Sequence, residues 1–215
     1  MSESRTTAGA AAHIDSDAIR SRFPALRRVV GGHPVAYFDG PGGTQVPETV
    51  AGAVRDYLLH HNGNAGWNYP TSRETGALLA DSRAAAADLF GGRPDEVAFG
   101  PSMTTLTLRI SRALGRTLEP GDRVVVTQLD HHANVDPWKA LGDERGAEVR
   151  AVRMDPATGT LDMDDLADAL DGARILAIGA ASNALGTMPD LEAAMGLARS
   201  AGATTYVDAV HYAPH

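Results

Sequence analysis

Short apolar runs alternate with amphipathic stretches along most of this sequence. The clearest runs are rich in β-branched or other apolar residues and occupy positions 122–128, 147–153, 174–179 and 204–208. Runs of this length and composition are typical of strands buried on both faces of a parallel sheet. The stretches between them carry apolar positions at helical spacing. Strands that alternate with helices predict an α/β fold with a mainly parallel sheet flanked by helices.

The N-terminal part of the chain is less regular. We expect two further short strands at 35–38 and 96–99, and a helix that follows residues 100–105 and runs to about residue 114. Residues 1–15 are rich in Ser, Thr and Ala, which predicts a disordered tail before one domain over residues 16–215.

Composition narrows the class of protein. The hydrophobic share of 43% and charged share of 21% are those of an ordinary soluble globular protein. A net charge of -8 without a basic stripe argues against a nucleic-acid partner. The chain has no cysteine, which excludes disulfides and thiolate chemistry within it. No apolar run is long enough to span a membrane and no secretory segment is evident, so we expect a cytoplasmic protein.

Polar residues follow several of the expected strands. Ser102, Thr104 and Thr105 stand at a helix start, where they form either an anion site or an ordinary N-cap. The adjacent His131 and His132 lack the spacing of a zinc pair, so we expect no metal there and consider ring stacking or a solvated turn instead.

The two later strands also end in polar residues. Asn183 either donates its amide to a ligand oxygen or forms a local turn. Asp208 follows the last strand, with His211 three residues later, and an acid at the end of a buried strand needs a cation or hydrogen bonds. Glycine fingerprints for dinucleotides and nucleotide phosphates are missing, which disfavours a nucleotide-binding protein.

Taken together, these segments resemble the large domain of the class V aminotransferases, in particular the cysteine desulfurase group of fold-type I pyridoxal 5'-phosphate (PLP) enzymes. The most specific match is Asp130-His131-His132-Ala133-Asn134 with Pro137-Trp138, which is similar to the family's E-H-H-A-N-x-x-P-W. The other matches are Tyr37-Phe38-Asp39, Ser182-Asn183-Ala184-Leu185-Gly186 and Asp208-Ala209-Val210-His211. Leu106 departs from the glutamate that usually follows the paired threonines. The resemblance implies the PLP-dependent transferase (aspartate aminotransferase-like) fold.

The resemblance also implies roles for single residues, with PLP as the cofactor. Asp208 would bind the ring nitrogen, and His131 would stack on the ring and assist proton transfer. Thr104 and Thr105 would hold the phosphate. Asn183 and His211 would lie near the ring hydroxyl, and Gly42 and Gly43 would lie beside the substrate.

Enzymes of this family hold PLP as a Schiff base on a lysine that lies beyond residue 215 in the alignment of motifs. Lys139 is the only lysine here, matches no such position, and is expected at the surface. The resemblance therefore implies a chain truncated before that lysine and lacking the small C-terminal domain.

The leading hypothesis is the PLP-binding portion of a cysteine desulfurase-like enzyme, which acts on an amino acid through external aldimine chemistry and forms a homodimer at full length. Such a portion would be inactive alone and would bind PLP weakly and without a covalent bond. The alternative hypothesis is a non-catalytic assembly or interaction fragment that pairs with a full-length homologue.

Overall fold

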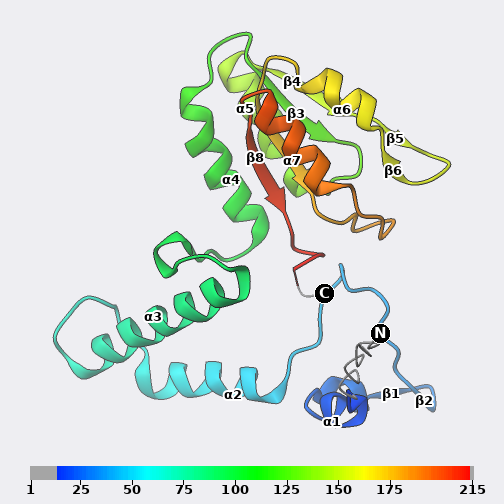
Figure 1. Ribbon diagram of the computed structural model, residues 1–215. Coiled ribbons are helices and arrows are strands. Elements are labelled where there is room, and N and C mark those ends of the chain that lie inside the picture. Colours follow the sequence, from blue (N-terminus) through cyan, green and yellow to red (C-terminus); the bar gives the residue numbers. More distant parts are fainter. Residues whose placement is uncertain (1–13, 214–215) are drawn as a thin grey trace, which may run out of the picture. The chain divides into compact units, whose positions relative to one another are not determined.

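The computed structural model describes residues 14–213 (Figure 1). Most of the expected disordered tail, 1–15, lies outside the described residues. Asp15 is described and begins an ordered helix, because its carboxylate accepts the backbone N–H groups of Asp17 and Ala18. The described chain divides after Ala98 into two compact units, each of which is best understood by itself.

The first unit is mainly helical. Its longest element, α3, is a 21-residue helix that begins with proline at its first turn and ends at Gly91 in the left-handed conformation, as helices commonly do. None of the helices in residues 14–213 combines the length and the apolar character needed to cross a membrane. The elements of this unit are α1 (Ser16–Ser21), η1 (Pro24–Arg27), β1 (Val29–Val30), β2 (His33–Pro34), α2 (Glu48–Asp56), the π-helical turn η2 (Tyr57–His61), α3 (Pro70–Phe90) and η3 (Pro94–Glu96).

The predictions of two strands in this part of the sequence, at 35–38 and 96–99, were wrong. Residues 35–38 are in no strand. The antiparallel pair β1–β2 ends at Pro34, and the Val35 N–H adds one further hydrogen bond to this ladder, to the Arg28 carbonyl at 3.0 Å. The expected strand at 96–99 starts inside η3. That turn is closed by the Glu96 carboxylate, which accepts from the Arg93 N–H at 2.8 Å.

The second unit contains the parallel sheet that the sequence predicts. Its strands run in the order β4-β3-β7-β8, and every neighbouring pair is parallel. All four strands were expected from their apolar runs, and the last was predicted with its bounds correct. They are β3 (Arg123–Thr127), β4 (Glu148–Val152), β7 (Ala173–Gly179) and β8 (Thr204–Asp208), with a small antiparallel hairpin of β5 (Met154–Asp155) and β6 (Thr160–Leu161).

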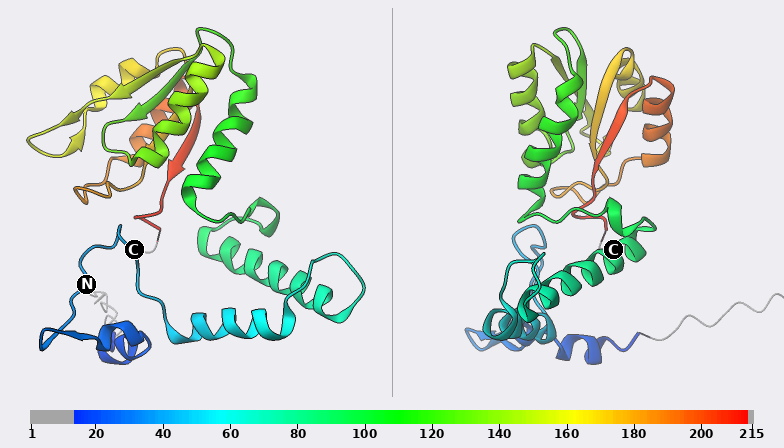
Figure 2. Two further views of the ribbon diagram at one scale, coloured as in Figure 1. Left: turned by 180° about the vertical axis from the view of Figure 1, so that it is seen from behind. Right: turned by 90° about the vertical axis from the view of Figure 1, so that its left-hand side faces the viewer.

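Helices cover both faces of this sheet. Figure 2 shows α4 and α5 on one face and α6 and α7 on the other. Two hydrophobic clusters match these two layers, because successive residues of a strand point to opposite faces. The helical elements of this unit are α4 (Met103–Leu114), η4 (Gly115–Thr117), η5 (His132–Asn134), α5 (Asp136–Arg145), α6 (Met163–Leu170) and α7 (Leu191–Ser200).

The alternation is clearest in the central strands. Val124, Val126 and Ile175 pack with Trp138 of α5, whereas Val125 and Leu176 pack with the aliphatic residues of α6 and α7. All of these side chains are buried. The central strands β3 and β7 therefore hold the two layers together.

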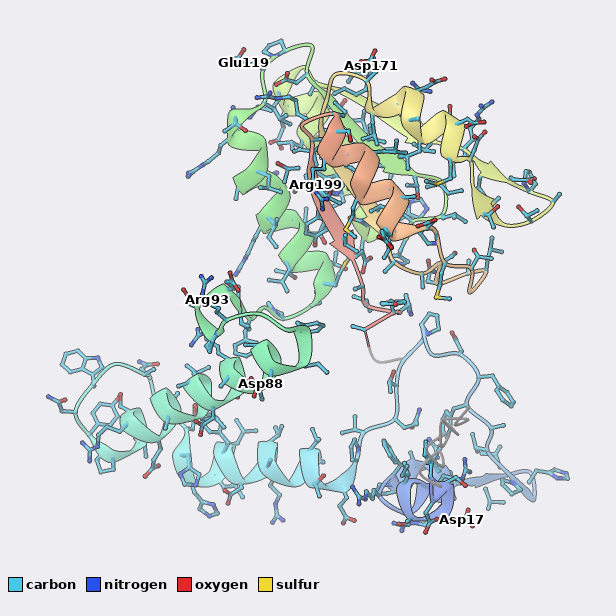
Figure 3. All side chains as sticks on the ribbon, in the orientation of Figure 1. Asp17, Asp88, Arg93, Glu119, Asp171 and Arg199 are labelled. Atoms are coloured by element: carbon cyan, nitrogen blue, oxygen red, sulfur yellow. The ribbon has the colours of Figure 1, made fainter. Side chains whose placement is uncertain are left out.

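Strand β8 is less buried than the sequence predicts. It was expected to be buried on both faces, but it lies at one edge of the four-stranded sheet and its residues are exposed or half-buried. Its carboxyl end lies at the opposite end of the sheet from Glu119 and Asp171, which are labelled in Figure 3 near the starts of β3 and β7. The Arg123 guanidinium donates to the Asp171 carbonyl at 2.9 Å there, so that end is occupied by structural contacts.

Asp165 gives a test of this packing. Its carboxylate accepts the Arg153 N–H and the Arg150 guanidinium, both at 2.8 Å, and these bonds hold the pKa of Asp165 below its ordinary value. We expect Asp165→Ala to lower the free energy of unfolding at pH 7 by about 1–3 kcal/mol, because both donors lose their acceptor.

A lowered pKa means that this stabilisation is present above the unfolded-state pKa of about 4 and is lost as the pH falls through the folded value. Urea unfolding of both proteins at pH 7 and pH 3 measures the effect. Asp168→Ala, an exposed change on the same helix, is the control and should stay within about 0.5 kcal/mol of wild type. Equal losses in the two variants would contradict this account.

Candidate functional site

The carboxyl ends of β3, β7 and β8 bring polar residues together in the second unit. In a parallel sheet these ends lie at one edge, where ligands of α/β proteins bind. Gly179 at the end of β7 is paired in register with Asp208 at the end of β8, and the Ala180 N–H donates to the Asp208 carbonyl at 2.8 Å. The carboxyl of Asp130, which follows β3, is close enough to Asp208 for their charges to interact.

Asp208 is half-buried and held by its own turn. Its Oδ1 accepts the Val210 N–H at 3.1 Å. The turn continues through Tyr212 and Ala213, whose N–H groups donate to the Ala209 carbonyl at 3.0 and 2.8 Å. His211 lies within this turn and is half-buried. A carboxylate has about four lone-pair sites, so Asp208 keeps acceptor capacity for a further donor.

Helix α4 begins with a hydroxyl cap. Ser102 Oγ accepts the Thr105 N–H at 3.3 Å and lies 3.2 Å from the Thr105 hydroxyl. The N-cap interpretation of this segment is therefore correct for Ser102. Thr104, on the first turn, is exposed. The positive end of the helix dipole at this point still favours an anion.

His131 and His132 both line two hollows of the second unit. One, of about 460 Å³, lies at the start of α4 and is mainly apolar. The other, of about 360 Å³, is bounded by the loop after β7 and includes Asp130 and Asn183 in its wall. Neither wall includes Asp208 or His211. The first hollow is lined by Thr104, Leu108, His131, His132, Ala133, Asp136, Pro137 and Ala140.

The two adjacent histidines have different environments. His131 begins η5, and its Nδ1 accepts the Ala133 N–H at 3.1 Å. In the neutral ring this bond places the proton on Nε2. His132 is exposed, and its Nδ1 lies 3.5 Å from a carboxylate oxygen of Asp136. The Nδ1 atoms of the two histidines therefore have different partners.

The loop after β7 is ordered by Ser182 rather than by Asn183. Ser182 Oγ accepts the N–H groups of Ala184 and Leu185 at 3.4 and 3.3 Å, and its own N–H donates to the Thr187 carbonyl at 2.9 Å. The serine therefore forms the local turn that was considered for the asparagine. Asn183 is half-buried in the wall of the second hollow.

Asp130 lies in a buried hydrogen-bond chain that sequence reasoning missed. Its carboxyl accepts from the Thr127 hydroxyl and, at 2.8 Å, from the Asn134 amide. Asn134 in turn accepts from Trp138 Nε1 at 3.2 Å. The spacing of 130, 134 and 138 is the four-residue repeat of one helical face, and that repeat could have revealed the chain. A side chain at Gly179 would come within 2.9 Å of Asp130, so only glycine fits there.

Burial raises the pKa of Asp130 to about 6, against the opposing effect of the bonds from Thr127 and Asn134. The nearby charge of Asp208 raises it further, and a Gly179 backbone bond lowers it. The charged form of a carboxyl is disfavoured when water is excluded and when a second anion is near. Asp130 therefore holds a proton more tightly than a carboxyl in water does.

Two candidate features belong to other elements of the chain. Gly42 and Gly43 belong to the first unit, where Asp39 Oδ1 accepts the Gly42 N–H at 3.1 Å. Lys139 lies on α5 and is exposed, as expected. It is absent from the walls of both hollows, although its neighbours Pro137 and Ala140 line the first.

Comparison with known proteins identifies this architecture. A family model, Aminotransferase class-V, matches residues 36–215. A cysteine desulfurase of Serratia proteamaculans is 31% identical over 201 residues, covering 92% of this chain and 49% of that protein. A probable cysteine desulfurase of Halobacterium salinarum is 35% identical over 209 residues, covering 94% of this chain and 49% of its own length.

Solved structures agree. The apo cysteine desulfurase from Thermococcus onnurineus NA1 matches with a TM-score of 0.86 and 26% identity, over 96% of this chain and 50% of that one. A cysteine desulfurase of Escherichia coli matches with a TM-score of 0.81 and 26% identity, over 94% and 50%. The chain thus has the α/β fold of these fold-type I enzymes, as the sequence predicted. It belongs to the class V aminotransferase family, and it spans about half the length of the relatives that it matches.

The pKa of Asp130 can be tested through stability. A raised pKa means that the folded protein holds the proton more tightly, so its contribution is complete below about pH 4 and is lost as the pH rises through about 6. We expect wild type to lose stability relative to Asp130→Asn as the pH rises over this range. Urea unfolding of both proteins from pH 4 to pH 7 measures the difference in their free energies of unfolding. Asp143→Asn, an exposed change on α5, is the control and should show no such trend. A difference that is constant with pH would refute the raised value.

Proposed function

We propose that this chain binds PLP at the carboxyl end of its parallel sheet and that the enzyme to which it belongs acts on an amino acid, as cysteine desulfurases do. The observation that carries the proposal is Asp208, a half-buried acid at the end of β8 beside the turn that presents His131. Membership of the class V aminotransferase family supports it. The homodimer and the cytoplasmic location implied by the resemblance belong to the same proposal.

The start of α4 suits the phosphate group. Its hydroxyls and its dipole are those of an anion site, and Thr104 lines the hollow that also contains His131. We assign Thr104 and Thr105 to the phosphate. The Thr105 hydroxyl already contacts Ser102, so a phosphate there would share that hydroxyl with the cap.

The acidic edge suits the ring. We assign Asp208 to the protonated ring nitrogen, because a carboxylate stabilises that charge. Asn183 and His211 are assigned to the ring hydroxyl, and His131 to the ring face. When PLP is bound, it supplies an electron sink for bonds at the amino-acid α-carbon. The Nε2 of His131 is then the nitrogen available to carry a proton, because Nδ1 is engaged with the Ala133 N–H.

Covalent attachment is a separate matter. The sequence contains one lysine, and Lys139 is exposed on α5 outside both hollows. We therefore propose that the 215-residue chain binds PLP reversibly and does not turn over an amino acid by itself.

The binding prediction uses equilibrium dialysis and the absorbance of PLP. Asp208→Asn should weaken PLP binding by about 10- to 100-fold, since a hydrogen bond to a charged group contributes about 1.5–3 kcal/mol. Lys139→Arg is the matched control and should bind PLP as wild type does. Borohydride treatment followed by peptide mass mapping should find no PLP on Lys139. A reduced adduct at that residue, or unchanged binding by Asp208→Asn, would refute the assignment.

A second candidate is an assembly role, and one feature of the first unit favours it. Val50, Val54 and Leu58 recur at four-residue spacing and are 50%, 56% and 60% exposed. An apolar stripe of this kind is typical of a surface that another chain covers. Co-expression with a full-length cysteine desulfurase should then give a complex that Val54→Asp weakens at least about tenfold, whereas Arg55→Asp, an exposed change on the same helix, should leave it intact. A chain that stays monomeric beside the full-length enzyme would exclude this role.

A further inference from the structure

Tyr206 connects β8, the strand that ends at Asp208, to α4, the helix whose first turn contains Thr104 and Thr105. Tyr206 precedes Asp208 by two residues in β8, so both side chains point to the same face of the sheet. Its hydroxyl lies 2.8 Å from Oγ1 of Thr107, a residue of α4 that is 99 positions away in the sequence. Thr107 follows Thr105 by two residues and is completely buried.

The direction of this hydrogen bond follows from the second partner of Thr107. Thr107 Oγ1 also lies 3.1 Å from the Met103 carbonyl, which can only accept. A hydroxyl has one proton, so Thr107 donates to Met103 and accepts from Tyr206. The phenol of Tyr206 is thereby fixed to the first turn of α4. Burial raises the pKa of Tyr206 above its ordinary value, so the phenol keeps the proton that it donates.

The other side of Tyr206 contacts α5. The rings of Tyr206 and Trp138 meet edge to face with centroids 5.4 Å apart. Trp138 is buried and bonded to Asn134, which is bonded to Asp130 in the turn that presents His131. Tyr206 of β8 thus contacts both α4, whose first turn is assigned to the phosphate, and α5, which follows His131 in the sequence.

We propose that Tyr206 and Thr107 are positioning residues, whose hydrogen bond sets the spacing between the start of α4 and the carboxyl end of β8. This inference rests on the proposed binding of PLP, a rigid ligand whose phosphate and ring nitrogen must reach both ends at once. The surrounding cluster is apolar, with Val124, Val126 and Ile175 among its members. A satisfied polar pair in such a layer fixes one geometry, whereas apolar contacts are not directional.

The test separates ligands that use both ends from ligands that use one. PLP spans the two ends, whereas inorganic phosphate uses only the start of α4 and pyridoxal uses only the acidic end. We expect Tyr206→Phe and Thr107→Val to weaken PLP binding by roughly three- to tenfold, as loss of a neutral hydrogen bond does. Affinities for phosphate and for pyridoxal are measured by competition with PLP bound to the same protein at known occupancy. In both variants these two affinities should differ from those of wild type by less than about twofold.

Matched variants exclude a general loss of structure. Thr107→Ser keeps the hydroxyl and should restore PLP affinity to that of wild type. Ser111→Ala, also buried in α4, removes a hydroxyl that donates to the Leu108 carbonyl of the same helix, and should leave all three ligands unaffected. The double variant Tyr206→Phe with Thr107→Val should bind PLP no more weakly than the worse single variant, because both remove one bond.

Each other outcome overturns a stated part of the argument. If wild type does not bind PLP, the proposed function fails and the inference fails with it. If wild type binds PLP and Tyr206→Phe binds it equally well, only the inference fails. A similar loss for PLP, phosphate and pyridoxal, or a failure of Thr107→Ser to restore affinity, would show a structural role in place of positioning.

Discussion

The parallel pairing of β7 with β3 and β8 is the constraint on which the candidate site depends. It aligns the carboxyl ends of three strands, so Asp130, Asn183 and Asp208 meet at one edge although they are far apart in the sequence. The register matters as much as the order. A slip of β8 by one residue would turn Asp208 and Tyr206 to the face of α6 and α7 and separate both from α4. Tyr206 and Val207 of β8 pack against the apolar clusters on the two faces, and this packing resists that slip.

Two acids lie close together at the carboxyl edge of the sheet, Asp130 after β3 and Asp208 at the end of β8. Burial of the Asp130 carboxyl, together with the charge of Asp208, favours the protonated form of Asp130. Below about pH 6 the neutral form of Asp130 removes one of the two nearby negative charges at this edge. Because the two groups interact, a cation placed against Asp208 would in turn weaken the hold of Asp130 on its proton.

The sequence predicts the parts of this molecule that depend on local pattern. Strand β8 was predicted residue for residue, because an apolar β-branched run stopped at Asp208. The strands at 35–38 and 96–99 failed because a strand needs a partner, and propensity alone does not say whether one is available. The candidate site residues came from short motifs, whereas Tyr206 and Thr107 could not be paired, since their contact exists only after α4 packs against β8.

The distribution of buried polar groups separates the two faces of the sheet by purpose. Thr107, Ser111 and Asn134 are buried in elements on the face of α4 and α5, whereas on the other face Asp165 of α6 is buried and α7 contributes no buried polar side chain within the described residues. A buried hydroxyl or amide adds little net stability once its desolvation is counted. Aliphatic side chains of similar size would hold α4 and α5 at least as firmly. Both faces have an apolar cluster that stabilises the sheet, so the hydroxyl and amide groups on the face of α4 and α5 are better explained by geometry than by stability: the bond between Thr107 and Tyr206 fixes where α4 lies relative to β8.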